Sequence, residues 1–204
     1  MAKRAAPEVN AGSMADIAFL LLIFFLVTTT IETDAGLNRK LPPLEPPTEK
    51  PPVLREKNIF EVVVNKNNQL LVENELTELK SLQQKAIDFL DNGGGVGAEA
   101  CNYCQGKRSA SSSDNPEKAV ISLQNDRETN YKTYIAVQNE LVAAYNFLRN
   151  REAQKLYGQD FTEMYADYND PKTSDGVKEE LKPKVEAIQK MFPQKLSEAE
   201  PRSN

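Results

Sequence analysis

The sequence predicts a single transmembrane α-helix joined to a small α+β domain whose elements follow the order β-β-α-β-α. Two observations lead to this fold class. The first is an unbroken apolar run at residues 17–27 (IAFLLLIFFLV) in a chain that is otherwise hydrophilic. The second is a succession of strand-like and helix-like patterns after residue 57. The length of 204 residues allows one modest domain with appendages.

The composition excludes several classes of function. The chain has no histidine, which removes histidine-based acid–base catalysis, the usual serine and cysteine nucleophile systems and most zinc sites. Its net charge is −5 and its Lys and Arg residues are scattered, so no nucleic-acid partner is expected. The glycine-rich segment 93–97 lacks the Lys-Ser/Thr of a phosphate-binding loop and is interpreted as a flexible linker. We therefore expect a protein that is not an enzyme and binds no metal ion.

The predicted transmembrane helix covers residues 13–31. These 19 residues form a helix of roughly 28 Å, close to the ~30 Å thickness of the hydrocarbon layer. Lys3 and Arg4 precede the helix and two acidic residues follow it. Because positive charge stays on the cytoplasmic side, the amino terminus is predicted to be inside and the residues after the helix outside.

Two other interpretations of the apolar segment stay open. A cleaved signal peptide has a basic start, an apolar run and a small-x-small site such as Thr-Asp-Ala at 33–35. The acidic Asp16 and the long polar lead-in argue against it. A buried core helix is the second alternative, and the charge asymmetry and the apolar side chains all round the helix argue against that.

Asp16 is the predicted working residue. A carboxylate at the centre of a bilayer costs about 2.5–3.5 kcal/mol, so it is retained where it has a function. A desolvated carboxyl group can take up and release a proton near neutral pH. The alternative is an acid in the first turn, where the helix dipole favours it. At about 100° per residue, the residues that share its helix face and are predicted to contact a partner helix are Leu20, Ile23, Val27 and Thr30.

The rest of the chain divides by composition and periodicity. Six prolines between residues 42 and 52 predict a polyproline II spacer. The predicted elements after it are a hairpin over 58–73, helices over 78–90 and 129–157, a strand over 119–123, a helix over 177–191 and a late strand over 194–197. The predicted parts of the chain are a cytoplasmic tail (1–12), the transmembrane helix (13–31), a Pro-rich linker (32–57) and an α+β domain (58–204).

Two cysteines, Cys101 and Cys104, lie in a Gly/Ser-rich insertion over residues 92–118. A redox Cys-x-x-Cys motif opens a helix after a strand, and a metal site needs more than two thiolates. In an oxidising compartment the pair is expected to form a local disulfide or to remain as unreactive thiols. The extended tail over 158–204 has no assigned role.

The amino-terminal segment carries a family resemblance. The stretch EVNAGSMADI at residues 8–17, continued by LLLIFFLVTTT and by Leu-Pro at 41–42, resembles the signature of the ExbD/TolR family in forms from Bacteroidota. Its members are small subunits of proton-driven motors in the bacterial inner membrane, and their single transmembrane carboxylate falls on Asp16. Many members have Thr-Pro ahead of the acid, where this chain has GSMA at 12–15. The resemblance is specific over 8–42, holds only in pattern over 58–150, and is absent from the insertion and much of the tail.

The resemblance also implies partners and a location. It implies a homodimer whose helices thread through a ring of the larger, multi-spanning ExbB/TolQ-type subunit, with protons as the coupling ion and no other cofactor. A TonB-like protein that spans the periplasm receives the energy for outer-membrane transport. The chain is then a single-pass inner-membrane protein with a cytoplasmic amino terminus and a periplasmic domain. A TolR-like role in envelope integrity, a membrane-anchored module that binds peptidoglycan, and a secreted thiol protein remain alternatives.

Overall fold

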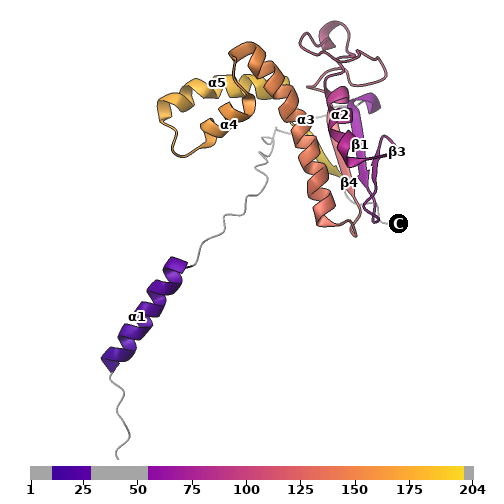
Figure 1. Cartoon of the computed structure of the whole chain (residues 1–204). Helices are drawn as coiled ribbons and strands as arrows, with labels where there is room; N and C mark the ends of the chain where they lie inside the picture. The colour runs from indigo at the N-terminus through magenta and orange to yellow at the C-terminus, as the bar shows by residue number, and fades with distance from the viewer. Residues whose placement is uncertain (1–10, 29–54, 200–204) are drawn as a thin grey trace, which may run out of the picture. The chain divides into compact units, whose positions relative to one another are not determined.

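The structure, a computed structural model, describes residues 11–28 and 55–199, which belong to two separate units (Figure 1). The first unit contributes one helix, α1 (Ala11–Thr28). The second unit is a mixed sheet with helices. Its elements are the 3-10 turn η1 (Glu56–Asn58), β1 (Ile59–Val64), β2 (Leu70–Val72), β3 (Glu75–Thr77), α2 (Leu79–Leu90), the 3-10 turn η2 (Gly97–Glu99), β4 (Val120–Asn125), α3 (Tyr131–Tyr157), α4 (Phe161–Asn169), α5 (Asp175–Met191) and β5 (Leu196–Ala199).

The fold class predicted from the sequence is wrong in its first part, the transmembrane helix. Within residues 11–28 and 55–199, no helix combines the length and the apolar composition that a membrane crossing requires. The unbroken apolar run has only 11 residues. This run makes about 17 Å of helix, roughly half of the ~30 Å hydrocarbon layer. The end of the predicted span, residues 29–31, and nearly all of the predicted Pro-rich linker lie outside the described residues.

The predicted order β-β-α-β-α is also incomplete, because the second unit runs β-β-β-α-β-α-α-α-β. β3 and α4 were not predicted. β3 has three residues and follows a two-residue turn at Glu73 and Asn74, both with positive φ (51° and 66°). Two-residue hairpin turns of this kind normally contain glycine. This turn contains none, so the sequence pattern did not indicate it. The predicted hairpin, the helix over 78–90 and the late strand form as β1–β2, α2 and β5.

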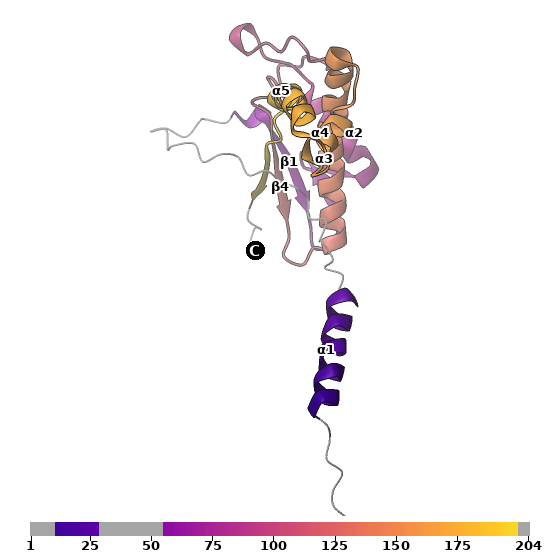
Figure 2. The ribbon, with the colours of Figure 1, turned by 90° about the vertical axis from the view of Figure 1, so that its left-hand side faces the viewer.

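The five strands lie in the order β3-β2-β1-β4-β5. β1 pairs antiparallel with β2 and parallel with β4, and β5 adds parallel to β4 at one edge. β1 alternates between buried and more exposed side chains, with Phe60, Val62 and Val64 buried. These residues join buried side chains of α2 and α3 in one core. Helices α2 and α3 lie side by side on one face of the sheet (Figure 2).

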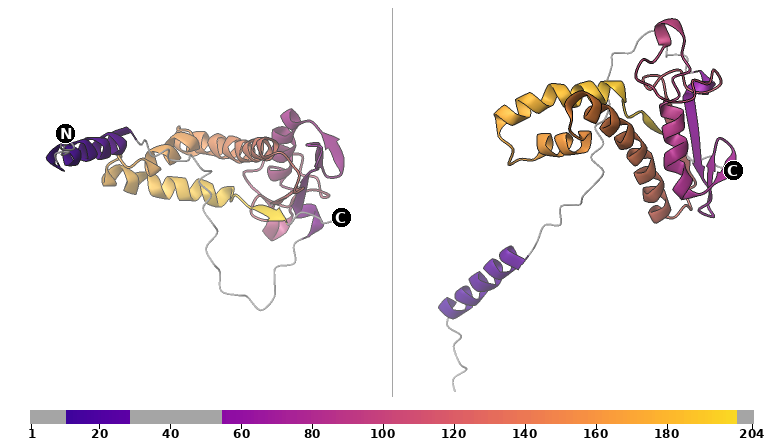
Figure 3. Two further views of the ribbon diagram at one scale, coloured as in Figure 1. Left: turned by 90° about the horizontal axis from the view of Figure 1, so that it is seen from below. Right: turned by 45° about the horizontal axis from the view of Figure 1, so that its top comes forward.

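The chain after residue 149 forms a second, smaller core. Its buried members come from the end of α3 and from α4 and α5: Ala153, Phe161, Met164, Leu181, Val185 and Ile188. Gly158 ends α3 with a φ of +70°, a left-handed conformation that glycine adopts without strain. Helices α4 and α5 then pack against each other at the far end of α3 (Figure 3). The chain returns from α5 through Phe192 to the sheet as β5.

Candidate functional site

Asp16 lies in the second turn of α1 and its side chain is exposed. The first turn of α1 contains no acidic residue. The helix dipole acts mainly within the first turn, so stabilisation by the dipole does not account for the position of Asp16. Asp16 is also the only charged residue between Ala11 and Thr28.

The structure describes only part of the helix face that was predicted to contact a partner helix. Leu20 and Ile23 are 59% and 39% exposed on the face of α1 that carries Asp16. The side chain of Val27 and the whole of Thr30 lie outside what the structure describes. The other large apolar side chains described on α1 are also exposed, on every side of the helix: Met14, Ile17, Phe19, Leu21, Leu22, Phe24 and Phe25. A helix that is apolar on every side is normally buried on every side, by other protein or by lipid.

The start of the second unit is tied to the insertion through Asp114. This side chain is buried and accepts hydrogen bonds from Lys57 Nζ and, at 3.0 Å, from Asn58 Nδ2. In return the Asn58 side-chain oxygen accepts the backbone N–H of Asp114 at 2.8 Å. Arg55 lies 3.6 Å from the same carboxylate. The insertion therefore holds the segment that leads into β1.

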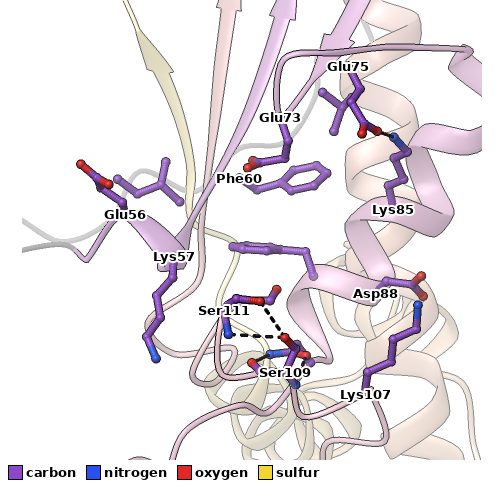
Figure 4. Close-up of a pocket in the computed structure, with 15 residues that line it drawn as sticks. Glu56, Lys57, Phe60, Glu73, Glu75, Lys85, Asp88, Lys107, Ser109 and Ser111 are labelled. Carbon is purple, nitrogen blue, oxygen red and sulfur yellow. Dashed lines mark hydrogen bonds and ion pairs between the residues drawn. The ribbon is translucent and has the colours of Figure 1, made fainter.

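A pocket of about 420 Å³ opens beside this contact, between β1, α2 and the insertion (Figure 4). Phe60 and Phe89 stack in it, with ring centroids 5.0 Å apart. Charges of both signs line the opening, and Lys85 forms an ion pair with Glu75 at 3.2 Å. Within residues 11–28 and 55–199, no three His, Cys, Asp or Glu side chains are grouped to hold a metal ion.

Cys101 and Cys104 are joined by a disulfide in the structure, and both residues are buried. The glycine-rich segment before them is not the flexible linker predicted from its composition. Gly94 and Gly95 donate backbone hydrogen bonds to the carbonyls of Ser113 and Asp114 at 3.0 and 2.8 Å. A Cβ atom on Gly94 would lie 2.1 Å from the Ser109 carbonyl oxygen. Glycine is present because two backbones approach closely, not because the chain is loose.

Comparison with protein families matches residues 2–149 to the family described as Biopolymer transport protein ExbD/TolR. The chain belongs to the ExbD/TolR family. The match includes α1 with Asp16, the sheet up to β4, the insertion and most of α3. A comparison with curated proteins finds no significant match. ExbD/TolR proteins are in general inner-membrane, non-enzymatic subunits of transport motors that work with ExbB/TolQ and TonB/TolA partners.

The part of the chain that follows the ExbD/TolR match is held by a buried arginine. Arg149, the last matched residue, donates hydrogen bonds from Nε and Nη2 to the Phe192 carbonyl at 3.0 and 2.7 Å. Its guanidinium lies over the rings of Tyr145 and Phe161, 5.7 and 5.2 Å from their centroids. Burial lowers the pKa of Arg149 to about 10, which still leaves the side chain charged at neutral pH. Sequence reasoning missed Arg149 and Asp114, because neither belongs to a recognisable motif in the local sequence.

Proposed function

We propose that this chain is the ExbD-type small subunit of a proton-driven motor that energises TonB-dependent outer-membrane transport. The observation that carries the proposal is one carboxylate, Asp16, on a helix that has no other charge and exposes apolar side chains in every direction. Membership of the ExbD/TolR family supports the same role. A homodimer of α1 helices, covered by a larger ExbB/TolQ-type subunit, would bury that apolar surface and the carboxylate with it.

In this proposal Asp16 binds a proton in an apolar, partner-lined environment and releases it at a second position. Loss of the charge removes the cost of burying Asp16, so the protonated helix can occupy a packing that the ionised helix avoids. One proton moving through 100 mV supplies about 2.3 kcal/mol. That energy is enough to shift the ratio of two helix packings by roughly 50-fold. In this proposal protons are the coupling ion, and no other cofactor takes part.

We place the 55–199 unit in the periplasm. The Cys101–Cys104 disulfide supports this location, because disulfides persist in oxidising compartments and are rare in the bacterial cytoplasm. There the unit transmits the work of the motor to a TonB-like protein. Peptidoglycan is a further candidate partner for the same unit.

Substitution of Asp16 tests the proposal. The Asp16→Asn variant keeps the shape of the side chain and removes its titratable proton. In a strain without the native copy, it should reduce energy-dependent uptake through an outer-membrane receptor to the level of a strain lacking the chain. Copurification with the larger subunit should be unchanged, and the Asp16→Glu variant, which retains a carboxyl group, should restore part of the uptake.

The alternatives give different results in the same strains. Normal uptake in the Asp16→Asn strain would contradict a proton-carrying role for Asp16. Normal uptake together with sensitivity to detergents and loss of periplasmic proteins would instead favour a TolR-like role in envelope integrity. Loss of copurification would show that the substitution acts on assembly rather than on proton transfer.

A further inference from the structure

The insertion and the tail, which lie far apart in sequence, contact each other through Tyr103. The Tyr103 hydroxyl donates a hydrogen bond to the Met191 carbonyl at 2.7 Å, across 88 residues of sequence. Its ring packs edge-on against Phe192, with centroids 5.4 Å apart. Burial, aided by the charges of nearby acidic residues, raises the pKa of Tyr103 to about 12. The hydroxyl therefore remains a hydrogen-bond donor at any physiological pH.

Tyr103 stands inside the loop that the disulfide closes, between Cys101 and Cys104. That loop packs closely on the chain that follows α2. A Cβ atom on Gly93 would lie 2.7 Å from the Cys104 Cβ atom. The backbone N–H of Cys104 also donates to the Cys101 sulfur at 3.1 Å. The disulfide loop that carries Tyr103 thus packs on Gly93.

On the tail side, Tyr103 contacts the turn that carries the chain from α5 into β5. Phe192 is fully buried in the main core, and its carbonyl is held by Arg149. Four residues further on, β5 begins at Leu196 and pairs with β4 at the edge of the sheet. Lys195 adds a second link to the insertion, because its Nζ donates to the Glu117 carbonyl. The insertion therefore contacts the chain on both sides of the residue pair at 193–194.

We propose that the Cys101–Cys104 disulfide is a redox switch, called the lock below. When the disulfide forms, the insertion holds the α5–β5 turn (residues 191–195) in place. This contact completes the edge strand β5. Oxidation joins the two sulfurs and transfers two electrons and two protons to a more oxidising protein disulfide, which becomes a dithiol. In the reduced chain the two thiols separate from the bonded distance of about 2.0 Å. Since both cysteines lie against Gly93 and Tyr103 is between them in the chain, this separation displaces Tyr103 from Met191 and Phe192.

The lock concerns the stability of β5 and does not depend on proton transfer at Asp16. Hydrogen exchange measured by mass spectrometry on the full chain in detergent micelles tests it. Reduction with dithiothreitol should speed amide exchange over residues 192–199 about tenfold, the loss expected for one buried hydrogen bond and one aromatic contact. Exchange in β1 and β2 should not change.

The Tyr103→Phe variant separates the lock from a general effect of reduction, because it keeps the disulfide and the ring and removes only the hydroxyl. It should speed exchange over residues 192–199 about fivefold under oxidising conditions. The matched control is Tyr131→Phe, at a tyrosine that is 75% exposed at the start of α3, and it should leave exchange unchanged. Unchanged exchange over 192–199 after reduction, or an equal increase in every element, would overturn the proposal.

Discussion

Replacing Phe192 with alanine is expected to lower the free energy of unfolding of the 55–199 unit by about 3–5 kcal/mol. Phe192 is 0% exposed and stands where the chain leaves α5 for the sheet. Its ring contacts Tyr103 and belongs to the main core. Truncation leaves a cavity between the sheet and the turn, and the neighbouring side chains can fill it only in part. Urea unfolding followed by far-ultraviolet circular dichroism measures the change.

The control for this prediction is Phe147→Ala on α3. Phe147 is 53% exposed, so its truncation should change the free energy of unfolding by no more than about 0.5 kcal/mol. Both variants remove the same ring, and they differ in whether that ring is buried. If Phe192→Ala costs no more than Phe147→Ala, the α5–β5 turn is not part of the core, and the tail is an appendage rather than a component of the sheet.

The elements with regular periodicity could be predicted from the sequence. Phe60, Val62 and Val64 alternate as a half-buried strand should, and they are buried as a set. Leu82, Ala86, Phe89 and Leu90 follow helical spacing and face the core. These patterns are local. A strand that covers a core places every second residue inward, and a helix places every third or fourth residue inward. A segment of three residues such as β3 is too short to show either period.

The contacts that hold the second unit together could not be predicted, because their partners are distant in sequence. Arg149 reaches Phe192 across 43 residues, Asp114 reaches Asn58 across 56, and Tyr103 reaches Met191 across 88. Local patterns contain no information on such pairs. The glycines at 93–95 were misinterpreted for the same reason, since the carbonyl that Gly94 approaches belongs to Ser109.

The transmembrane prediction failed for a different reason. It extended an apolar run of 11 residues into a 19-residue span by adding four residues at either end, most of which are polar. A run of roughly 10–14 apolar residues is also typical of a helix that is buried against other protein. Asp16 lies just before the apolar run. It is predicted to carry a proton only if a partner protein encloses it. The position of the acid on α1 could be inferred from the sequence, whereas the surroundings of α1 could not.

Replacing Asp114 with alanine is expected to lower the free energy of unfolding by about 2–3 kcal/mol at neutral pH, the value of hydrogen bonds to a buried charged group. Burial acts to raise the pKa of Asp114, but hydrogen bonds from Lys57 and Asn58 and the charges of Lys57 and Arg55 outweigh it. The pKa therefore lies below the ordinary value of 3.8. A carboxyl group whose pKa is lower in the folded state stabilises the fold fully above its unfolded pKa. It loses that contribution as the pH falls through the folded pKa.

The difference in stability between the wild-type chain and Asp114→Ala should consequently be constant above about pH 5 and shrink below about pH 4. Urea unfolding at a series of pH values measures it. Glu180→Ala is the control, because Glu180 forms an exposed ion pair with Lys184 one helical turn away and should contribute little. A difference for Asp114→Ala that persists undiminished at the lowest pH would show that packing, rather than the carboxylate, holds the insertion to the start of β1.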